Sequence, residues 1–387
     1  MYNIKTLNKI SPCGIECFDR DQYAVGDNIS NPDAVMVRSA SMQETELPDT
    51  LVAIARAGAG VNNIPVERCT EQGIVVFNTP GANAGGVKEL VLAGMLMCSR
   101  KVAPALDWAK TLKGQGDEVG KLVEKGKSAF AGPEIAGKKL GVIGLGAIGI
   151  LVANAAKSLG MTVYGYDPYL SVDAAWNLSR SIIHAKDLRE IYAECDYITL
   201  HVPLTDDTRH LVCAKTLDQM KNGVRILNFA RAALVDDAAI IEALGTGKVA
   251  AYVTDFPTDA VLGVEGIVAL PHLGASTPES EDNCATMAAQ QLVDYLENGN
   301  IRNSVNLPAA EMARSGEGRL CVVHKNTPNI ITRIAGVFSA ENINIENMLN
   351  KSKKDIAYTI VDVSAEVTAA LRDAVLAIDG VIRVRSI

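Results

Sequence analysis

KLGVIGLGAIGILVANAAKSLGMTVYGYD, residues 139–167, is the stretch that decides the fold of this chain. Its glycine-rich centre, GLGAIG (144–149), follows an apolar run typical of a buried strand and begins a segment typical of a helix. A second β-rich run, MTVYGYD (161–167), ends on Asp167, 18 residues after Gly149. Strand, glycine turn, helix, strand and acid in this order predict a dinucleotide-binding βαβ unit.

Each glycine of this turn has its own expected role. Gly144 allows the tight turn, Gly146 lets the backbone approach a pyrophosphate, and Gly149 lets the helix pack close to the strand. The amides of the helix N-terminus would face the phosphates. Asp167 would accept hydrogen bonds from the adenosine ribose and repel a 2′-phosphate, which favours NAD over NADP. The alternative is a glycine-rich turn in an unrelated α/β protein.

Composition and charge narrow the class of protein. A chain of 387 residues predicts two or three domains, and 48% hydrophobic against 21% charged residues argues against disorder. The net charge of −8 disfavours nucleic acid as a partner, because binding a phosphate backbone needs a basic surface. No nucleic-acid partner is therefore expected.

The termini and cysteines suggest where the protein works. MYNIKTLNKISPCG, at the start, lacks the apolar core of a secretory signal. The longest uncharged run, 140–156, carries four glycines and is better explained by a buried strand, turn and helix than by a membrane span. Of eight scattered cysteines only Cys13 and Cys17 lie close together, with no nearby histidine. We expect a cytoplasmic protein with reduced thiols, no bound metal and no membrane segment.

Strands and helices also alternate on both sides of the glycine turn. Upstream, strands are expected at 34–39, 52–58 and 74–80, followed by a helix over 87–100. Downstream, strands are expected at 197–203, 224–230, 250–256 and 267–272. Such alternation predicts parallel sheets, with a doubly wound sheet around the nucleotide-binding unit. A polar stretch, PAAEMARSGEGR (308–319), then interrupts the pattern, and 320–387 read as a ferredoxin-like βαββαβ module.

Three candidate catalytic residues lie at or shortly after the ends of predicted strands. Ligands of doubly wound sheets bind outside the carboxyl ends of the strands, where Arg231, Asp259 and His272 lie in sequence. Oxidation of a 2-hydroxy acid needs a base for the hydroxyl proton, a cation for the carboxylate and an acid that orients the base. A lone histidine near apolar residues is more often structural, so these three residues point to catalysis only as a set.

These motifs resemble the D-isomer-specific 2-hydroxy acid dehydrogenases from Met36 to Ile387. The set comprises VRS, ARAGAGVNNI, NTPGANA, GLGAIG, HVPLT, NFARAALVD and PHLGAST. Within the family, the match is to members that oxidise 3-phospho-D-glycerate to 3-phosphohydroxypyruvate with NAD in serine biosynthesis. The resemblance implies a Rossmann-type NAD domain over 96–279, a flavodoxin-like substrate domain over 1–95 and 280–308, and a linker over 309–319.

The resemblance assigns roles at the predicted site. Arg231 would bind substrate, His272 would be the acid/base, and Asp259 would replace the glutamate that usually partners the histidine. Asp255 matches an aspartate near the nicotinamide carboxamide if one residue is deleted, and otherwise Thr254 takes that place.

Further binding residues are implied in the same way. NAD contacts fall on Gly144, Gly146, Ala147, Ile148, Gly149, Asp167, Phe229, Ala230, Arg231, Asp255, His272, Leu273, Gly274 and Ala275. The substrate's anionic ends would meet Arg38, Arg231 and the amides of Ala57, Gly58, Ala59 and Gly60, with Arg56 and Asn78 as weaker candidates.

Residues 320–387 resemble an ACT domain, a ligand-binding module of amino-acid biosynthetic enzymes. His324, Asn326 and Asn344 match residues that hold L-serine in such modules. Asn329 stands where glycine is common, and asparagine tolerates left-handed backbone. Paired modules imply a homodimer or homotetramer, and the alternative is a module that serves assembly only. Two rival functions also stay open: a dehydrogenase of another 2-hydroxy acid, and a non-catalytic NAD-sensing protein on the same fold.

Overall fold

The computed structural model describes all 387 residues and divides into two compact units. The first unit comprises Met1–Ala82 and Glu281–Ile387, and the second comprises Asn83–Ser280. Residues 83–95 thus belong to the second unit, although we had placed them in the substrate domain. The reason is packing: the helix that begins at Ala84 buries Val87, Val91 and Met95 in a core of the second unit.

The second unit is built on a seven-stranded parallel sheet. Its strand order is β12-β11-β10-β9-β6-β7-β8, which reverses direction between β6 and β9. This order confirms the doubly wound sheet, and ligands of such sheets bind where the strand order reverses. The strands are β6 (Lys139–Ile143), β7 (Thr162–Tyr166), β8 (Ile183–His184), β9 (Tyr197–Leu200), β10 (Val224–Asn228), β11 (Val249–Thr254) and β12 (Ile267–Ala269).

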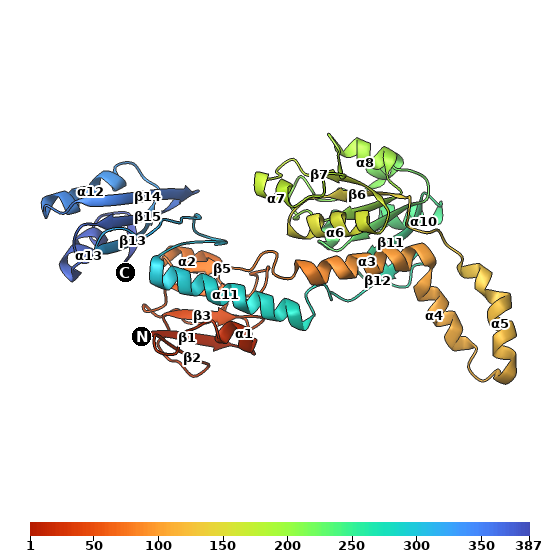
Figure 1. The fold of residues 1–387 in the computed structure, drawn as a ribbon, viewed down its shortest axis with the longest axis horizontal. Coiled ribbons are helices and arrows are strands. Elements are labelled where there is room, and N and C mark those ends of the chain that lie inside the picture. The colour runs from red at the N-terminus through yellow and green to blue at the C-terminus, as the bar shows by residue number, and fades with distance from the viewer. The chain divides into compact units, whose positions relative to one another are not determined.

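Helices cover both faces of this sheet (Figure 1). One face packs on α3 (Ala84–Arg100) and α6 (Ala147–Ser158), and the other packs on α8 (Leu188–Glu194), α9 (Ala214–Asp218) and α10 (Asp237–Gly245). The short α7 (Val172–Trp176) has no buried residue. Because helices cover both faces, the central strand β9 is buried along its whole length, as is usual in parallel sheets.

A helical arm projects from this unit (Figure 1). It comprises α4 (Val102–Thr111), η1 (Gly116–Glu118), α5 (Val119–Gly126) and η2 (Lys127–Phe130), none of which has a buried residue. Trp108 of α4 packs against Phe130 at the end of η2, with ring centroids 5.2 Å apart and planes tilted by 40°. None of the helices combines the length and apolar character that crossing a membrane requires.

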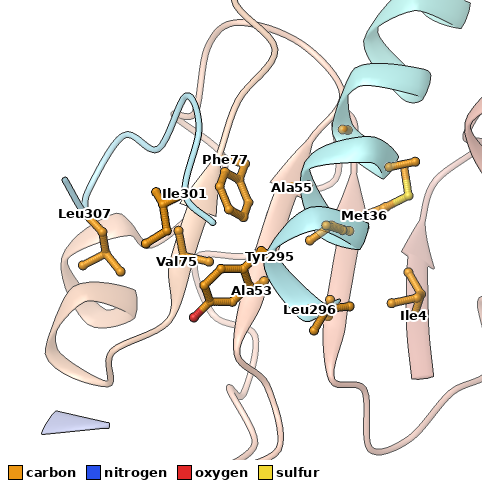
Figure 2. Packing of buried hydrophobic residues seen from close by; sticks show 14 of the residues in the cluster. Ile4, Met36, Ala53, Ala55, Val75, Phe77, Tyr295, Leu296, Ile301 and Leu307 are labelled. Carbon is orange, nitrogen blue, oxygen red and sulfur yellow. The ribbon is translucent and has the colours of Figure 1, made fainter. Parts of the chain in front are cut away.

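The first unit contains a five-stranded parallel sheet of order β2-β1-β3-β4-β5. This is the flavodoxin-like order, formed by β1 (Tyr2–Leu7), β2 (Tyr23–Gly26), β3 (Ala34–Val37), β4 (Ala53–Arg56) and β5 (Val75–Phe77). The short helices are α1 (Pro12–Ile15) and α2 (Val66–Glu71). Figure 2 shows the core between the strands and α11 (Pro278–Asn298), where Phe77 meets Tyr295 edge to face at 5.8 Å.

The C-terminal module forms a four-stranded antiparallel sheet of order β14-β15-β13-β16. Its elements confirm the βαββαβ pattern: β13 (Gly318–Lys325), α12 (Ile330–Ala340), β14 (Ile345–Lys353), β15 (Ile356–Val363), α13 (Ala369–Leu376) and β16 (Val381–Ser386). One face of the sheet packs on α12 and α13. Residues of the other face, Cys321, Val323, Tyr358 and Ile360, share a core with the five-stranded sheet and α11.

Cationic side chains attach the module to the rest of the first unit. Arg319, fully buried, pairs with Asp362 at 2.6 Å and donates to the carbonyls of Asn298, Met312 and Ala313. Arg383 donates to the carbonyls of Asp49, Leu51 and Gln72, and Arg385 to those of Tyr295 and Leu296. Arg319 lies in the stretch that we expected to be a linker. The shared core and these bonds make the module and the five-stranded sheet one body.

Candidate active site

The glycine turn has the close contacts that its sequence predicts. Gly144 adopts φ 91°, and a Cβ there would lie 2.5 Å from the carbonyl oxygen of His201 at the end of β9. A Cβ on Gly149 would lie 1.9 Å from the carbonyl oxygen of Gly144. Both positions therefore exclude any side chain, because backbone atoms occupy the space.

Gly146, by contrast, faces open space. It begins α6 as its N-cap, and no atom lies within 4 Å of the position that a Cβ would take. Gly146 and Ala147 are exposed and Ile148 is half-buried, so the amides of the first helical turn are accessible. A helix N-terminus with free space before it fits the pyrophosphate of a dinucleotide.

Asp167, directly after β7, hydrogen-bonds to the glycine turn. One carboxylate oxygen accepts a hydrogen bond from the Leu145 amide at 2.9 Å, and the other accepts one from the Tyr169 amide at 2.8 Å. A carboxylate has about four acceptor sites in all, so this half-buried group can still accept ribose hydroxyls.

Arg231 lies in the turn after β10. The buried Asn228 shapes that turn, since its amide group donates to the Arg231 carbonyl at 2.9 Å and accepts from the Ala230 amide at 3.2 Å. The exposed guanidinium donates to the Ala230 carbonyl at 2.6 Å and lies 5.7 Å from the centre of the Phe256 ring. Sequence reasoning missed Asn228, although an asparagine directly after a strand is a signal for such a turn.

His272 follows β12 and meets the same aromatic ring. The imidazole and the Phe256 ring have centroids 4.4 Å apart. The structure thus brings Arg231 and His272, 41 positions apart in the sequence, to a single side chain. We did not predict Phe256 as a site residue, and its place directly after Asp255 was the available signal.

The two candidate aspartates have different surroundings. Asp255 is 2% exposed, and burial raises its pKa, while the nearby His272 and Arg231 oppose that rise. Asp259 is exposed. The only histidine–carboxylate ion pair of the chain joins His210 to Asp236 at 3.9 Å, so His272 contacts neither aspartate as an ion pair. The Asp259–His272 pair stays a prediction. Thr254 ends β11, is buried, and accepts a hydrogen bond from the Phe256 amide.

The remaining predicted NAD contacts lie along two loops. Phe229 is buried and Ala230 half-buried after β10. The loop after β12 has Leu273 exposed, Ala275 half-buried and Gly274 buried. The start of α3 supports this loop, because a Cβ on Gly86 would lie 2.8 Å from the Gly274 carbonyl oxygen.

Two arginines meet at the carboxyl ends of β3 and β4 in the first unit. The Arg56 side chain donates to the Arg38 carbonyl at 3.1 Å, and Arg38 pairs with Glu281 of α11 at 2.5 Å. Burial lowers the pKa of Arg56, and the charge of Arg38 lowers it further. Gly58 adopts φ 147°, and a Cβ there would lie 1.8 Å from the Arg56 guanidinium, so glycine makes room for it. The anion site expected at Arg38 and Arg56 stays a prediction, because Glu281 already pairs with the Arg38 guanidinium.

The loop after β4 lies next in the chain and carries the predicted substrate-binding amides. Asn78 donates to the Ala59 carbonyl at 2.6 Å, and Ala57 is buried. Gly60 is exposed, with no atom within 4 Å of a Cβ position, so its backbone is open to a ligand.

The predicted effector residues are divided within the module. His324 is buried, with one ring nitrogen 2.8 Å from the Lys325 carbonyl and the other 2.8 Å from the Thr359 hydroxyl, and burial lowers its pKa. The exposed Asn326 follows the end of β13, whereas the exposed Asn344 precedes the start of β14. Both strands run antiparallel to β15, so these two asparagines lie at opposite ends of the sheet. Asn329 adopts the left-handed φ of 68°.

Comparisons with known proteins agree with this architecture. The family model described as D-isomer specific 2-hydroxyacid dehydrogenase, NAD binding domain, matches residues 92–274. The chain is 36% identical over 300 residues to D-3-phosphoglycerate dehydrogenase of Methanocaldococcus jannaschii, covering 75% of this chain and 55% of that one. It is 32% identical over 352 residues to the enzyme of that name from Haemophilus influenzae, covering 88% and 82%.

A solved structure is similar as well. NAD+-bound 3-phosphoglycerate dehydrogenase of Entamoeba histolytica superposes with a TM-score of 0.58 at 26% identity, over 79% of this chain and 98% of that one. The chain spans about half the length of several relatives, including 52% of the rat protein. With matches of this extent on the two sheets and the glycine turn, the chain belongs to the D-isomer-specific 2-hydroxyacid dehydrogenases.

Proposed function

We propose that the chain catalyses the NAD-dependent oxidation of 3-phospho-D-glycerate to 3-phosphohydroxypyruvate, the first step of L-serine biosynthesis. The observation that carries this proposal is the convergence of Arg231 and His272 on Phe256, at the carboxyl edge of the dinucleotide-type sheet. Relatives at 32–36% identity that are named D-3-phosphoglycerate dehydrogenase support the choice of substrate.

The residues present suit that reaction. NAD, when bound, supplies the acceptor for the hydride that leaves C2 of the substrate. His272 takes the proton of the C2 hydroxyl as the carbonyl forms, and later releases it to water. Arg231 binds the substrate carboxylate through its two parallel donors and stabilises the oxygen that becomes the carbonyl. Asp259, at the position of the family's glutamate, is the predicted partner of His272.

Cofactor and substrate anions have separate binding groups. We infer that Gly146 and the first turn of α6 hold the pyrophosphate, and that Asp167 selects NAD over NADP through the ribose. The Arg38–Arg56 pair would bind an anionic group of the substrate, with the amides from Ala57 to Gly60 beside it. Two adjacent cations favour a phosphate, because a phosphate carries more charge than a carboxylate.

The module and the assembly complete the proposal. We propose L-serine as an effector of a cytoplasmic homodimer or homotetramer. Since Asn326 and Asn344 lie at opposite ends of one sheet, a full set of serine-binding residues needs Asn344 from a second copy.

An assay of NADH oxidation tests this function. Phosphohydroxypyruvate, pyruvate and 2-oxoglutarate are compared as substrates at equal concentrations. The proposal predicts the highest kcat/KM for phosphohydroxypyruvate. A preference for an unphosphorylated keto acid would assign the chain to another dehydrogenase of the family, and NADH binding without any oxidation would make it an NAD-sensing protein.

A further inference from the structure

Glu281 of α11 pairs with one of the two arginines that are expected to bind the substrate. Its carboxylate accepts a hydrogen bond from Nη2 of Arg38 at 2.5 Å, and this is the only hydrogen bond of the Arg38 guanidinium. The two side chains are 40% and 41% exposed. Arg56, which donates to the Arg38 carbonyl at 3.1 Å, is not in an ion pair. One of the two adjacent cations is thus neutralised from within the chain.

The start of α11 holds Glu281 beside Arg38, because α1 fixes the helix backbone. The Asp282 carboxylate accepts a hydrogen bond from the Ser11 hydroxyl at 2.5 Å. A Cβ on Gly14 would lie 2.7 Å from the backbone of Ala285, so the two helices are in close contact. Ala285 is itself buried. Glu281 therefore projects from a fixed part of the same compact unit that carries Arg38.

The Arg38 guanidinium cannot serve two anions equally well. Nη2 contributes to both edges of a guanidinium that present two parallel N–H groups, so an oxyanion bound in this bidentate way shares that nitrogen with Glu281. The carboxylate and the bound oxyanion would then be direct neighbours, and like charges repel each other. Glu281 also cancels one of the two positive charges that attract the anion.

We propose that Glu281 is a built-in competitor for the Arg38 guanidinium, which the phosphate of the substrate must displace in order to bind both arginines. The proposal rests on the proposed function, in which Arg38 and Arg56 bind an anionic group of the substrate. An ion pair between half-exposed side chains stabilises a protein only weakly, so a phosphate held by two arginines can displace it. Glu281 sets the affinity for the substrate and takes no part in the transfer of the hydride.

The opposite role of Glu281 would give the opposite kinetic result. If the carboxylate held Arg38 in the geometry that the substrate needs, removing its charge would raise KM. If the ion pair served folding alone, removing it would lower the melting temperature and would not improve binding. Only a competitor gives tighter substrate binding when it is removed.

The test compares Glu281→Gln with Glu279→Gln, an exposed carboxylate in the same helix turn. The reduction of phosphohydroxypyruvate is measured at saturating NADH. In Glu281→Gln, KM should fall about two- to fivefold at unchanged kcat, the effect of removing a weak ion pair. Glu279→Gln should match the wild type. The double variant Arg38→Gln/Glu281→Gln should have the KM of Arg38→Gln, because no guanidinium is left to compete for.

A second measurement does not depend on turnover. In a calorimetric titration with inorganic phosphate, Glu281→Gln and Glu281→Ala should bind about two- to fivefold more tightly than the wild type. An unchanged or raised KM, a lower KM that persists without Arg38, or no phosphate binding to any variant would overturn the proposal. Tighter phosphate binding by Glu281→Gln of a protein that reduces no keto acid would instead contradict the proposed function alone.

Discussion

Gly146 and Gly149 serve the same turn in opposite ways. At Gly149 the backbone of Gly144 occupies the place of a side chain, since a Cβ would lie 1.9 Å from the Gly144 carbonyl oxygen. Gly146 keeps space free in front of α6, where no atom lies within 4 Å of a Cβ position. Gly149 is therefore needed for folding and Gly146 for binding.

Alanine substitutions separate these two roles. Gly149→Ala should lower the melting temperature by several degrees or prevent folding, because backbone must shift to admit the methyl group. Gly146→Ala should leave the melting temperature within about 1–2 °C and weaken NADH binding, as measured by calorimetry. Equal loss of stability in both variants would contradict this assignment.

Asp255 gives a pH dependence of stability whose sign follows from its pKa. Burial raises the pKa of the folded carboxylate above its ordinary value of 3.8. The folded state then holds its proton to higher pH than the unfolded state, so the contribution of Asp255 to stability falls as pH rises through that window. Asp255→Asn removes this contribution.

The expected result is a difference between variants that depends on pH. The melting temperature of Asp255→Asn relative to wild type should be higher at pH 7 than at pH 3.5. The same comparison with Asp259→Asn should show little change with pH, because that carboxylate is exposed. A relative melting temperature of Asp255→Asn that falls as pH rises would show that the ionised carboxylate stabilises the fold.

At the scale of elements, sequence reasoning worked where local pattern and tertiary structure agree. The predicted strands of the two parallel sheets start within about one residue and end within about three residues of the observed strands, because apolar runs between turn residues form buried parallel strands. β1 and β2 were missed, since YNIKTL (2–7) mixes polar and apolar residues and YAVG (23–26) is short. Phe256 and Asn228 were missed because their contacts join different loops, which no single segment reveals.

At the start of the C-terminal module, tertiary contacts bury a segment whose polar sequence predicts a linker. GEGR reads as linker, yet β13 begins at Gly318 and Arg319 is fully buried. Asp362 from the paired strand and three carbonyls satisfy its guanidinium. Sequence reasoning placed Arg319 in a linker because its partner, Asp362, lies 43 positions further along the chain.

Breaking the Arg319–Asp362 pair tests how far this buried ion pair, which joins β13 to β15 within the module, stabilises the fold. Arg319→Met leaves Asp362 buried and uncompensated, which should cost about 3–5 kcal/mol of stability. The double variant Arg319→Met/Asp362→Leu should recover part of that loss, because no charge stays behind. Chemical denaturation measures both, and a single variant as stable as wild type would show that the pair does not stabilise the fold.

At the scale of the whole molecule, the module belongs to the same compact unit as Arg38 and Arg56, the predicted anion-binding residues. A ligand that binds the module would therefore act on the unit that carries these arginines, not on a separate domain joined by a linker. It can shift an equilibrium only through different affinities for two states, and coupling of about 1–3 kcal/mol is usual.

Complementation between chains tests the proposed serine site. Asn326→Ala and Asn344→Ala should each lose serine binding and serine inhibition while keeping uninhibited activity. Mixed oligomers of the two variants should regain binding at half the wild-type number of sites per dimer, because one site then has Asn326 from one copy and Asn344 from the other. Calorimetry without serine binding to the wild type, or without recovery in the mixture, would contradict a shared site.

In the proposed reaction, the hydride at C2 of 3-phospho-D-glycerate moves to NAD. Mass spectrometry of the NADH formed from substrate deuterated at C2 measures this transfer. The NADH should be one mass unit heavier than that from unlabelled substrate, and His272→Ala, which should still bind NADH, should form it about 10²–10⁴ times more slowly. NADH without deuterium, or no NADH from a wild-type protein that binds NAD, would show that the chain does not catalyse this transfer.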